Sequence, residues 1–308
     1  MAKKNYFRQR NTPVENLTFI AMMVAFDAIL SLFSALLPFA AVFVMLLVPL
    51  TSAFVASYCR AKFIPVYVIS ALGICLAVSA WNITNTVFYI FPSVLTGVLY
   101  GEAKKRQVPY SINIFISSLL SLGLFYLSLL FLKAVTGVDM VVFLLTLIRK
   151  QDSATAPEIF PLFAFAYSLA QMAIVHIFLQ SEFAHLGNVE IGENNVSKWY
   201  CLPSFTFLGG AIGCAFISAK AAYLLLGLGI YWALYCLYDI ALKKKPLPWI
   251  ILGILVVAGW LGFAALYSGL PAGNGLSFLA LPLLSIPITH FLNQVLLRKK
   301  GNDSTIKP

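Results

Sequence analysis

Residues 19–30 read FIAMMVAFDAIL, an apolar run that contains a single carboxylate, Asp27. The apolar character continues on both sides, from about residue 16 to residue 37. About 20 predominantly apolar residues are enough for a helix to cross a hydrocarbon core of about 30 Å. We therefore expect a transmembrane helix over residues 16–37, with Asp27 near its middle.

The rest of the chain repeats this pattern. Of its 308 residues, 61% are hydrophobic and only 10% are charged, whereas soluble domains are about 25% charged. Apolar runs of span length alternate with short polar clusters, which is typical of polytopic α-helical membrane proteins. The predicted fold class is all-α, a transmembrane helical bundle of about 8–10 spans. The ten predicted spans are 16–37, 40–58, 63–80, 83–101, 110–132, 158–181, 200–219, 221–242, 247–268 and 275–297.

The net charge of +10 is distributed as in membrane proteins rather than as in nucleic-acid-binding proteins. If the N-terminus is cytoplasmic, 17 of the 21 lysines and arginines fall in inside segments. The other four are Lys133, Arg149, Lys150 and Lys220. This bias follows the positive-inside rule. It predicts a multi-pass protein of the cell membrane with both termini in the cytoplasm, the lipid bilayer as its environment and no nucleic-acid partner.

A hydrophilic stretch over residues 183–199 divides the chain. We expect a six-span membrane bundle over 1–182, a cytoplasmic loop over 183–199 and a four-span part with a basic tail over 200–308. Within 200–242 only Lys220 indicates a turn between two spans. Residues 138–148 give only about 16 Å of helix, too short to cross, and are interpreted as an interfacial or re-entrant segment on the outer side.

Motifs of enzymatic chemistry are absent from the sequence. It has no P-loop, no GxSxG and no HExxH, and its five cysteines form no CxxC pair. We therefore predict a protein that is not an enzyme and has no cofactor or metal site, and we place a lipid-modifying enzyme well behind the other hypotheses. His176 and His290 fall within spans and are interpreted as hydrogen-bonded packing residues, with a proton relay as the alternative.

The first span carries two distinct polar or small-residue features. A carboxylate in the middle of a membrane is costly, so Asp27 should face the protein interior, a partner or a polar cavity, or be protonated. Ala21, Ala25 and Ala28 follow the i, i+4, i+7 spacing and share one face. Small residues four apart allow close helix approach. This alanine face (Ala21, Ala25 and Ala28) either docks on a partner protein or packs against other helices of the same chain.

The fourth span begins with WNITNTVFYIFP at residues 81–92. Trp81 is typical of a membrane interface. It is followed by a polar stripe at helical spacing, formed by Asn82, Asn85, Thr86 and Tyr89. Pro92 removes a backbone hydrogen bond and can kink the helix. The stripe either caps neighbouring helices or lines a cavity open to the exterior. Adding polar positions of other spans, the candidate ligand-binding residues are Asp27, Trp81, Asn82, Asn85, Tyr89, Asn113 and Gln171.

The first six spans resemble the substrate-binding S component of energy-coupling-factor transporters. That family has six helices and an Ala-x-x-x-Ala pattern in its first helix, matched here by AMMVA at residues 21–25. The resemblance implies that the alanine face docks on a transmembrane coupling protein that works with ATPases, and that a small molecule binds toward the outer side. Over its full length the chain is similar to the YybS-like family of bacterial integral membrane proteins, distant relatives of S components.

These observations lead to two hypotheses. In the first, the protein is a transporter subunit that binds a small molecule, of unknown identity, and has no ATPase of its own. In the second, it is a membrane structural or assembly factor without a ligand, and its intramembrane polar residues only join helices. Co-purifying partners distinguish the two, because only the first requires a coupling protein and ATPases.

Overall fold

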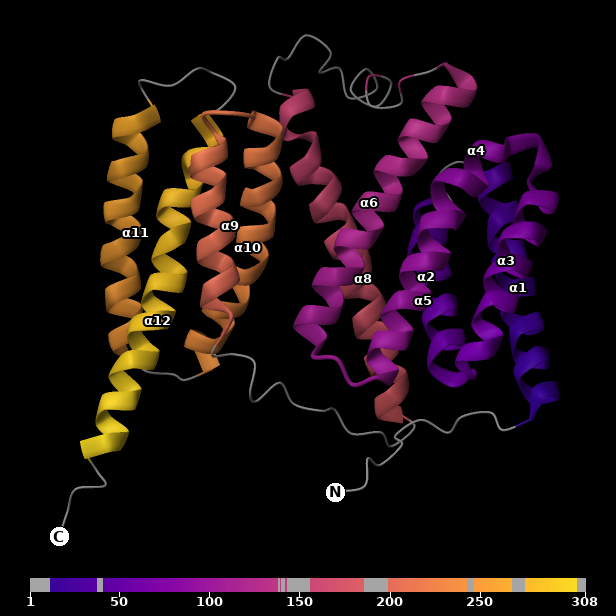
Figure 1. The fold of residues 1–308 in the computed structure, drawn as a ribbon, viewed down its shortest axis with the longest axis horizontal. Helices are drawn as coiled ribbons and strands as arrows, with labels where there is room; N and C mark the ends of the chain where they lie inside the picture. The colour runs from indigo at the N-terminus through magenta and orange to yellow at the C-terminus, as the bar shows by residue number, and fades with distance from the viewer. Residues whose placement is uncertain are drawn as a thin grey trace. The chain divides into compact units, whose positions relative to one another are not determined.

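The structure, a computed structural model, describes residues 12–37, 41–137, 139, 142, 156–185, 199–242, 246–267 and 275–303. Within these ranges all regular secondary structure is helical, which confirms the predicted all-α class. A helix lies at each of the ten predicted spans (Figure 1). The helices are α1 (Pro13–Leu36), α2 (Ala41–Tyr58), α3 (Ile64–Val78), α4 (Ile83–Asn85) continued by α5 (Phe91–Lys105), α6 (Tyr110–Thr136), α8 (Ala156–His185), α9 (Cys201–Cys214), α10 (Ala219–Leu242), α11 (Pro246–Tyr267) and α12 (Ala280–Asp303).

Seven helical segments in the described ranges are long and apolar enough to cross a membrane. They lie in α1, α3, α6, α8, α10, α11 and α12. Two further apolar helices are shorter. In α2 the apolar segment is Phe43–Tyr58, and α9 has 14 residues, or about 21 Å of helix. Length and composition together support a multi-pass integral membrane protein.

Local signals explain where the first helix begins. Thr12 is the N-cap of α1, and its Oγ1 accepts a hydrogen bond of 3.2 Å from the backbone N–H of Glu15. The carboxylate of Glu15 in turn accepts a hydrogen bond of 3.3 Å from the backbone N–H of Thr12. This reciprocal pair is a capping box, and Pro13 in the first turn adds a pre-set backbone angle.

The fourth predicted span is irregular where it approaches Pro92. A π-helical segment, η4 (Thr86–Ile90), joins α4 to α5, and Pro92 lies in the first turn of α5. Because proline has no N–H, the regular i→i−4 ladder cannot continue through it. The extra residue of a π turn accommodates that break, and such turns are frequent at functional sites.

The turn between α9 and α10 does not lie at Lys220, where the sequence predicted it. Instead α9 ends at Cys214, whose carbonyl accepts backbone hydrogen bonds of 2.9 Å from Ile217 and 2.8 Å from Ser218. The Ser218 hydroxyl then accepts a bond from the N–H of Ala221 at 3.5 Å. Serine is a preferred residue at a helix start, so the chain turns at Ser218 and Lys220 lies in the first turn of α10.

The chain forms two compact units. Unit 1 contains residues 1–143 and 167–192, and unit 2 contains residues 144–166 and 193–308. The helix α8 is therefore shared, since its residues up to Ala166 pack with unit 2 and those from Tyr167 onward pack with unit 1. Most of the predicted segment 138–148 and of the predicted loop 183–199 lies outside the described residues.

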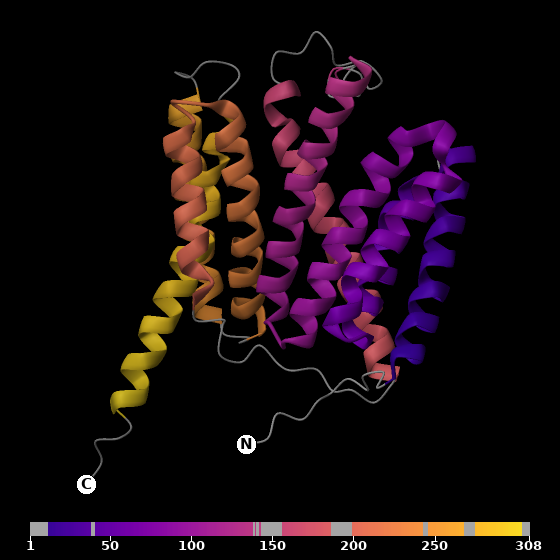
Figure 2. The ribbon, with the colours of Figure 1, turned by 45° about the vertical axis from the view of Figure 1, so that its right-hand side comes forward.

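In unit 1, α2 and α5 lie side by side (Figure 2). Two glycines of α5 permit this approach, because a Cβ built on Gly97 would lie 2.2 Å from the Pro49 carbonyl oxygen, and one on Gly101 would lie 2.3 Å from that of Ala53. The surrounding core is apolar and joins α1, α2, α3 and α5. It therefore closes tightly around the polar residues described below.

In unit 2, α10 packs against α9 and α12, and α12 also packs against α11 (Figure 1). Leu208 of α9 fits against Gly229 of α10, and the backbone at Pro282 of α12 approaches Gly259 of α11. Among the described residues of α11, only Pro248 and Leu252 are buried. This helix therefore presents most of its side chains to the surroundings of the unit, as expected for a helix in contact with lipid.

Candidate functional site

Asp27 is completely buried in unit 1, and both of its carboxylate oxygens accept hydrogen bonds. Thr51 Oγ1 of α2 donates to Oδ1 at 2.6 Å, and the Tyr67 hydroxyl of α3 donates to Oδ2 at 2.6 Å. A carboxylate within a membrane span is costly unless it is partnered, and it indicates a functional site by default. Here its partners come from two other helices.

The two hydroxyls that bind Asp27 are themselves held in place. Thr51 Oγ1 lies 2.8 Å from the carbonyl oxygen of Val48, and Ser52 Oγ lies 2.9 Å from the Tyr67 hydroxyl oxygen. We call Asp27, Thr51, Ser52 and Tyr67 the Asp27 cluster. All four residues are buried. The cluster is a closed polar centre that connects α1, α2 and α3.

A second set of buried hydroxyls lies one helical turn farther along α1. Ser31 Oγ donates to Ser79 Oγ at 3.5 Å, and Ser79 Oγ lies 2.6 Å from Thr86 Oγ1. We call Ser31, Ser79 and Thr86 the hydroxyl network. Ser31 shares the buried face of α1 with Asp27, and Ser79 Oγ also donates to the Cys75 carbonyl of α3 at 2.7 Å. Buried polar groups thus extend from Asp27 to the π-helical segment.

A cavity of about 330 Å³ adjoins the hydroxyl network. Its lining comes from α3, η4, α5 and α6 and is apolar except for two hydroxyl residues. One of them is Thr86, and the other is Ser128, whose Oγ donates to the Val87 carbonyl of the π-helical segment at 2.9 Å. The full lining is Leu72, Leu76, Thr86, Val87, Phe91, Leu127, Ser128 and Phe131. This volume lies within the usual range for small-molecule sites.

Only one residue of the predicted polar stripe of the fourth span lines this cavity. Trp81 is 64% exposed, and Asn82 lies at the end of a short 3-10 turn, where its N–H donates to the Ser79 carbonyl at 2.8 Å. The backbone of Asn85 belongs to α4, and its side chain lies outside the described atoms. Tyr89 packs against the apolar core of unit 1. The stripe residue that lines the cavity is Thr86.

Asn113 and Gln171 lie apart from the Asp27 cluster, and each joins helices. Asn113 Nδ2 donates to the Tyr100 carbonyl at 3.0 Å. Gln171 Nε2 donates to the Met45 carbonyl, and its Oε1 accepts a bond of 3.1 Å from Ser121. The structure therefore does not bring the seven candidate ligand-binding residues together around one space.

Both intramembrane histidines have hydrogen-bonding partners within their own unit. His176 Nδ1 lies 2.5 Å from the Tyr100 hydroxyl, and its ring stacks on Tyr110. In unit 2, His290 Nε2 lies 2.9 Å from Oδ2 of Asp239. These contacts tie α8 to α5 and α12 to α10.

The alanine face lies on the side of α1 away from the protein interior. Ala21 and Ala25 are exposed and Ala28 is half-buried, whereas Asp27 lies on the buried face together with Ile20, Val24 and Ser31. The two faces inferred from the sequence are thus separated in the fold. Among the described residues of the chain, the exposed alanines are open to a partner helix or to lipid.

The partners of Asp27 were missed by sequence reasoning. Thr51, Ser52 and Tyr67 are polar residues inside apolar runs, the same signal that singled out Asp27. Serine and threonine are common in helices because their hydroxyls can bond to the carbonyl one turn earlier. Only the fold shows that Thr51 and Tyr67 also reach a carboxylate on another helix.

Comparison of the chain with protein-family models, with curated proteins and with solved structures finds no match. The class of protein therefore rests on the fold and the composition. Several helices are long and apolar enough to span a bilayer, and together they make this a multi-pass membrane protein. Within it, a buried carboxylate and a neighbouring cavity form the candidate site.

Proposed function

We propose that the protein is the small-molecule-binding subunit of a membrane transporter, similar to an energy-coupling-factor S component. The observation that carries this proposal is the pairing of a completely buried carboxylate with a nearby cavity in the same unit. Asp27 shares the buried face of α1 with Ser31, and the hydroxyl network runs from Ser31 to Thr86, which lines the cavity of about 330 Å³. A polar centre of this kind is costly in a membrane, and a binding role accounts for it.

The lining of the cavity indicates the kind of ligand. Its side chains are apolar except for Thr86 and Ser128, and none of them carries a charge. Both hydroxyls are bonded within the protein, Thr86 to Ser79 and Ser128 to the Val87 carbonyl, so leucine and phenylalanine supply the surface that a ligand meets. The ligand is therefore a modest, largely uncharged molecule with an apolar or planar part, held mainly by burial of its apolar surface.

The remaining parts of the proposal follow from the sequence. The chain has no nucleotide-binding loop, so transport requires a coupling membrane protein and ATPases as partners. The alanine face supplies the surface for the coupling protein, since small residues allow a foreign helix to approach closely. The protein resides in the bacterial cell membrane, with both termini in the cytoplasm as the basic loops require.

Mass spectrometry of small molecules released from the purified protein tests the proposal. Leu127 lines the cavity and is 53% exposed, so Leu127→Trp fills the cavity with little risk to folding. Leu130 is 65% exposed on the same helix and is not among the lining residues, which makes Leu130→Trp a matched control. Wild type and the control should retain a molecule that Leu127→Trp loses. Equal retention by all three proteins, or no retained molecule in any, would count against the binding role.

A structural or assembly factor is the second candidate, and one observation favours it. Asn113 and Gln171 make hydrogen bonds to backbone groups of other helices, which is what polar residues do when they only join helices. In this case the purified protein brings down neither a coupling protein nor ATPases. The partners identified after mild detergent extraction therefore separate the two candidates.

A further inference from the structure

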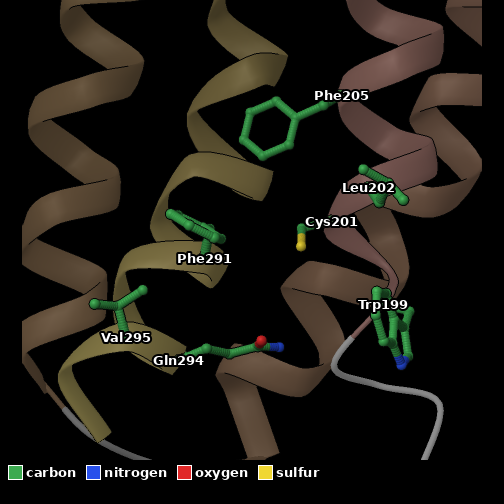
Figure 3. Close-up of a pocket in the computed structure, with 7 residues that line it drawn as sticks. All are labelled: Trp199, Cys201, Leu202, Phe205, Phe291, Gln294 and Val295. Carbon is green, nitrogen blue, oxygen red and sulfur yellow. The ribbon is translucent and has the colours of Figure 1, made fainter. Parts of the chain in front are cut away.

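Unit 2 contains a groove between the beginning of α9 and the middle of α12 (Figure 3). Its volume is about 480 Å³. The lining residues are Trp199, Cys201, Leu202, Phe205, Phe291, Gln294 and Val295. Figure 3 shows Phe205 and Phe291 on either side of the space and Gln294 extending its amide toward Trp199. The groove belongs entirely to unit 2 and takes no part in the proposed site of unit 1.

The wall of this groove is apolar and open. Leu202 is 60% exposed, Phe291 51% and Val295 47%. In a membrane-spanning unit, such side chains meet lipid rather than water. Apart from the Trp199 indole, the polar side chain of the lining is Gln294. Its amide nitrogen lies 3.4 Å from the ring of His290, which pairs with Asp239. One end of an otherwise apolar groove thus has an amide supported by a buried polar pair.

Charge indicates what occupies the groove. The helix α12 continues to Asp303 and carries Arg298, Lys299 and Lys300 in its last turns, beginning one turn after Gln294. Its C-terminal end projects beyond α9, α10 and α11 in both views (Figures 1 and 2). Basic residues at the end of a membrane helix attract anionic lipid headgroups. The groove therefore has an apolar wall, then an amide, and then a cationic helix end, in the order of a phospholipid's chain, glycerol region and headgroup.

We propose that the α9–α12 groove binds one anionic phospholipid. Its acyl chain lies between Phe205 and Phe291, its ester region is near Gln294, and its phosphate is at the basic end of α12. The apolar wall provides burial for the chain, and the cationic residues provide selectivity for negative charge.

Native mass spectrometry of the full-length protein tests this proposal. The detergent-solubilised protein is supplied with equimolar phosphatidylglycerol and phosphatidylcholine that have the same acyl chains. Wild type should retain phosphatidylglycerol in preference, at one lipid per chain. Replacing Arg298, Lys299 and Lys300 with glutamine should lower its apparent affinity by about 100-fold, since each cation near the surface contributes about fivefold.

The groove itself is tested by a matched pair of variants. Val295→Trp fills the groove, whereas Leu292→Trp adds the same bulk to α12 at a position that is 38% exposed and does not line it. Only Val295→Trp should lose the retained phosphatidylglycerol, and Leu202→Trp, on the opposite wall, should reproduce that loss. Equal retention of the two lipids by wild type, or equal effects of Val295→Trp and Leu292→Trp, would overturn the proposal.

Discussion

The Tyr67 hydroxyl donates a hydrogen bond of 2.6 Å to Oδ2 of Asp27, which ties α3 to α1 in the interior of unit 1. Thr51 of α2 occupies the other carboxylate oxygen at the same distance. Three helices therefore meet at one carboxylate that has no contact with solvent. Because a buried polar group that loses its hydrogen-bonding partner destabilises the fold, the stability of unit 1 depends on these two hydroxyls.

Tyr67→Phe removes one of them and keeps the ring. We expect a loss of about 1–3 kcal/mol in the free energy of unfolding, because Oδ2 of Asp27 is left buried without its donor. Tyr238→Phe is the control, since Tyr238 is 55% exposed and its hydroxyl makes no such contact with a buried carboxylate. Thermal unfolding in detergent measures both. Equal melting temperatures for the two variants would show that the Asp27–Tyr67 bond contributes nothing to stability.

The contact between α2 and α5 provides a prediction about packing. In Gly97→Ala, the new Cβ would lie 2.2 Å from the Pro49 carbonyl oxygen and 2.6 Å from Cβ of Ser52, so the helices must move apart. Overpacking of this kind typically lowers the free energy of unfolding by about 1–3 kcal/mol, and by more where the backbone has to shift.

Gly73→Ala is the matched control for that experiment. Gly73 is exposed within α3, and a Cβ there has no heavy atom within 4 Å. Replacing a glycine within a helix by alanine at such a position should raise the free energy of unfolding by about 0.5–1 kcal/mol. The two substitutions therefore shift the melting temperature in opposite directions. A shift of the same sign for both would contradict the close approach of α2 and α5.

Hydropathy was sufficient to place the helices, because a span needs a continuous apolar run and the runs are separated by polar clusters. It was not sufficient at the α9–α10 turn. Residues 200–242 are almost uniformly apolar, and the signal lay in the capping capacity of Ser218 rather than in the charge of Lys220. Periodicity also placed Asp27 and the alanine face on different sides of α1.

The candidate site was less accessible to sequence reasoning. Single-helix periodicity identifies which residues share a face, but it does not show which faces of different helices meet. The stripe of the fourth span illustrates this limit, because Thr86 lines the cavity while Tyr89 packs in the core. The π-helical segment Thr86–Ile90 contributes to the difference, since it changes the angular spacing that a regular helix would have.

The charge distribution predicts the orientation of the chain in the membrane. With 17 of 21 basic residues in segments assigned to the inside, both termini and the predicted loop 183–199 should be cytoplasmic. In a cysteine-free background, Asn194→Cys should resist a membrane-impermeant thiol reagent added to intact cells, and Ala272→Cys should react with it. Comparable labelling at the two positions would rule out this topology.

The alanine face provides the final prediction, which concerns the proposed transporter partner. Ala21 and Ala25 are exposed on α1, so tryptophan at either position adds bulk outside the core and should leave unit 1 folded. If a coupling protein docks on this face, its helix cannot approach past two indoles, and co-purification should fall to background in the double variant Ala21→Trp/Ala25→Trp. Leu130→Trp, at a 65% exposed position of α6, controls for added surface bulk. A double variant that keeps its partners at wild-type yield would exclude the face as the docking surface, and one that fails to fold would show that the alanines serve packing within the chain.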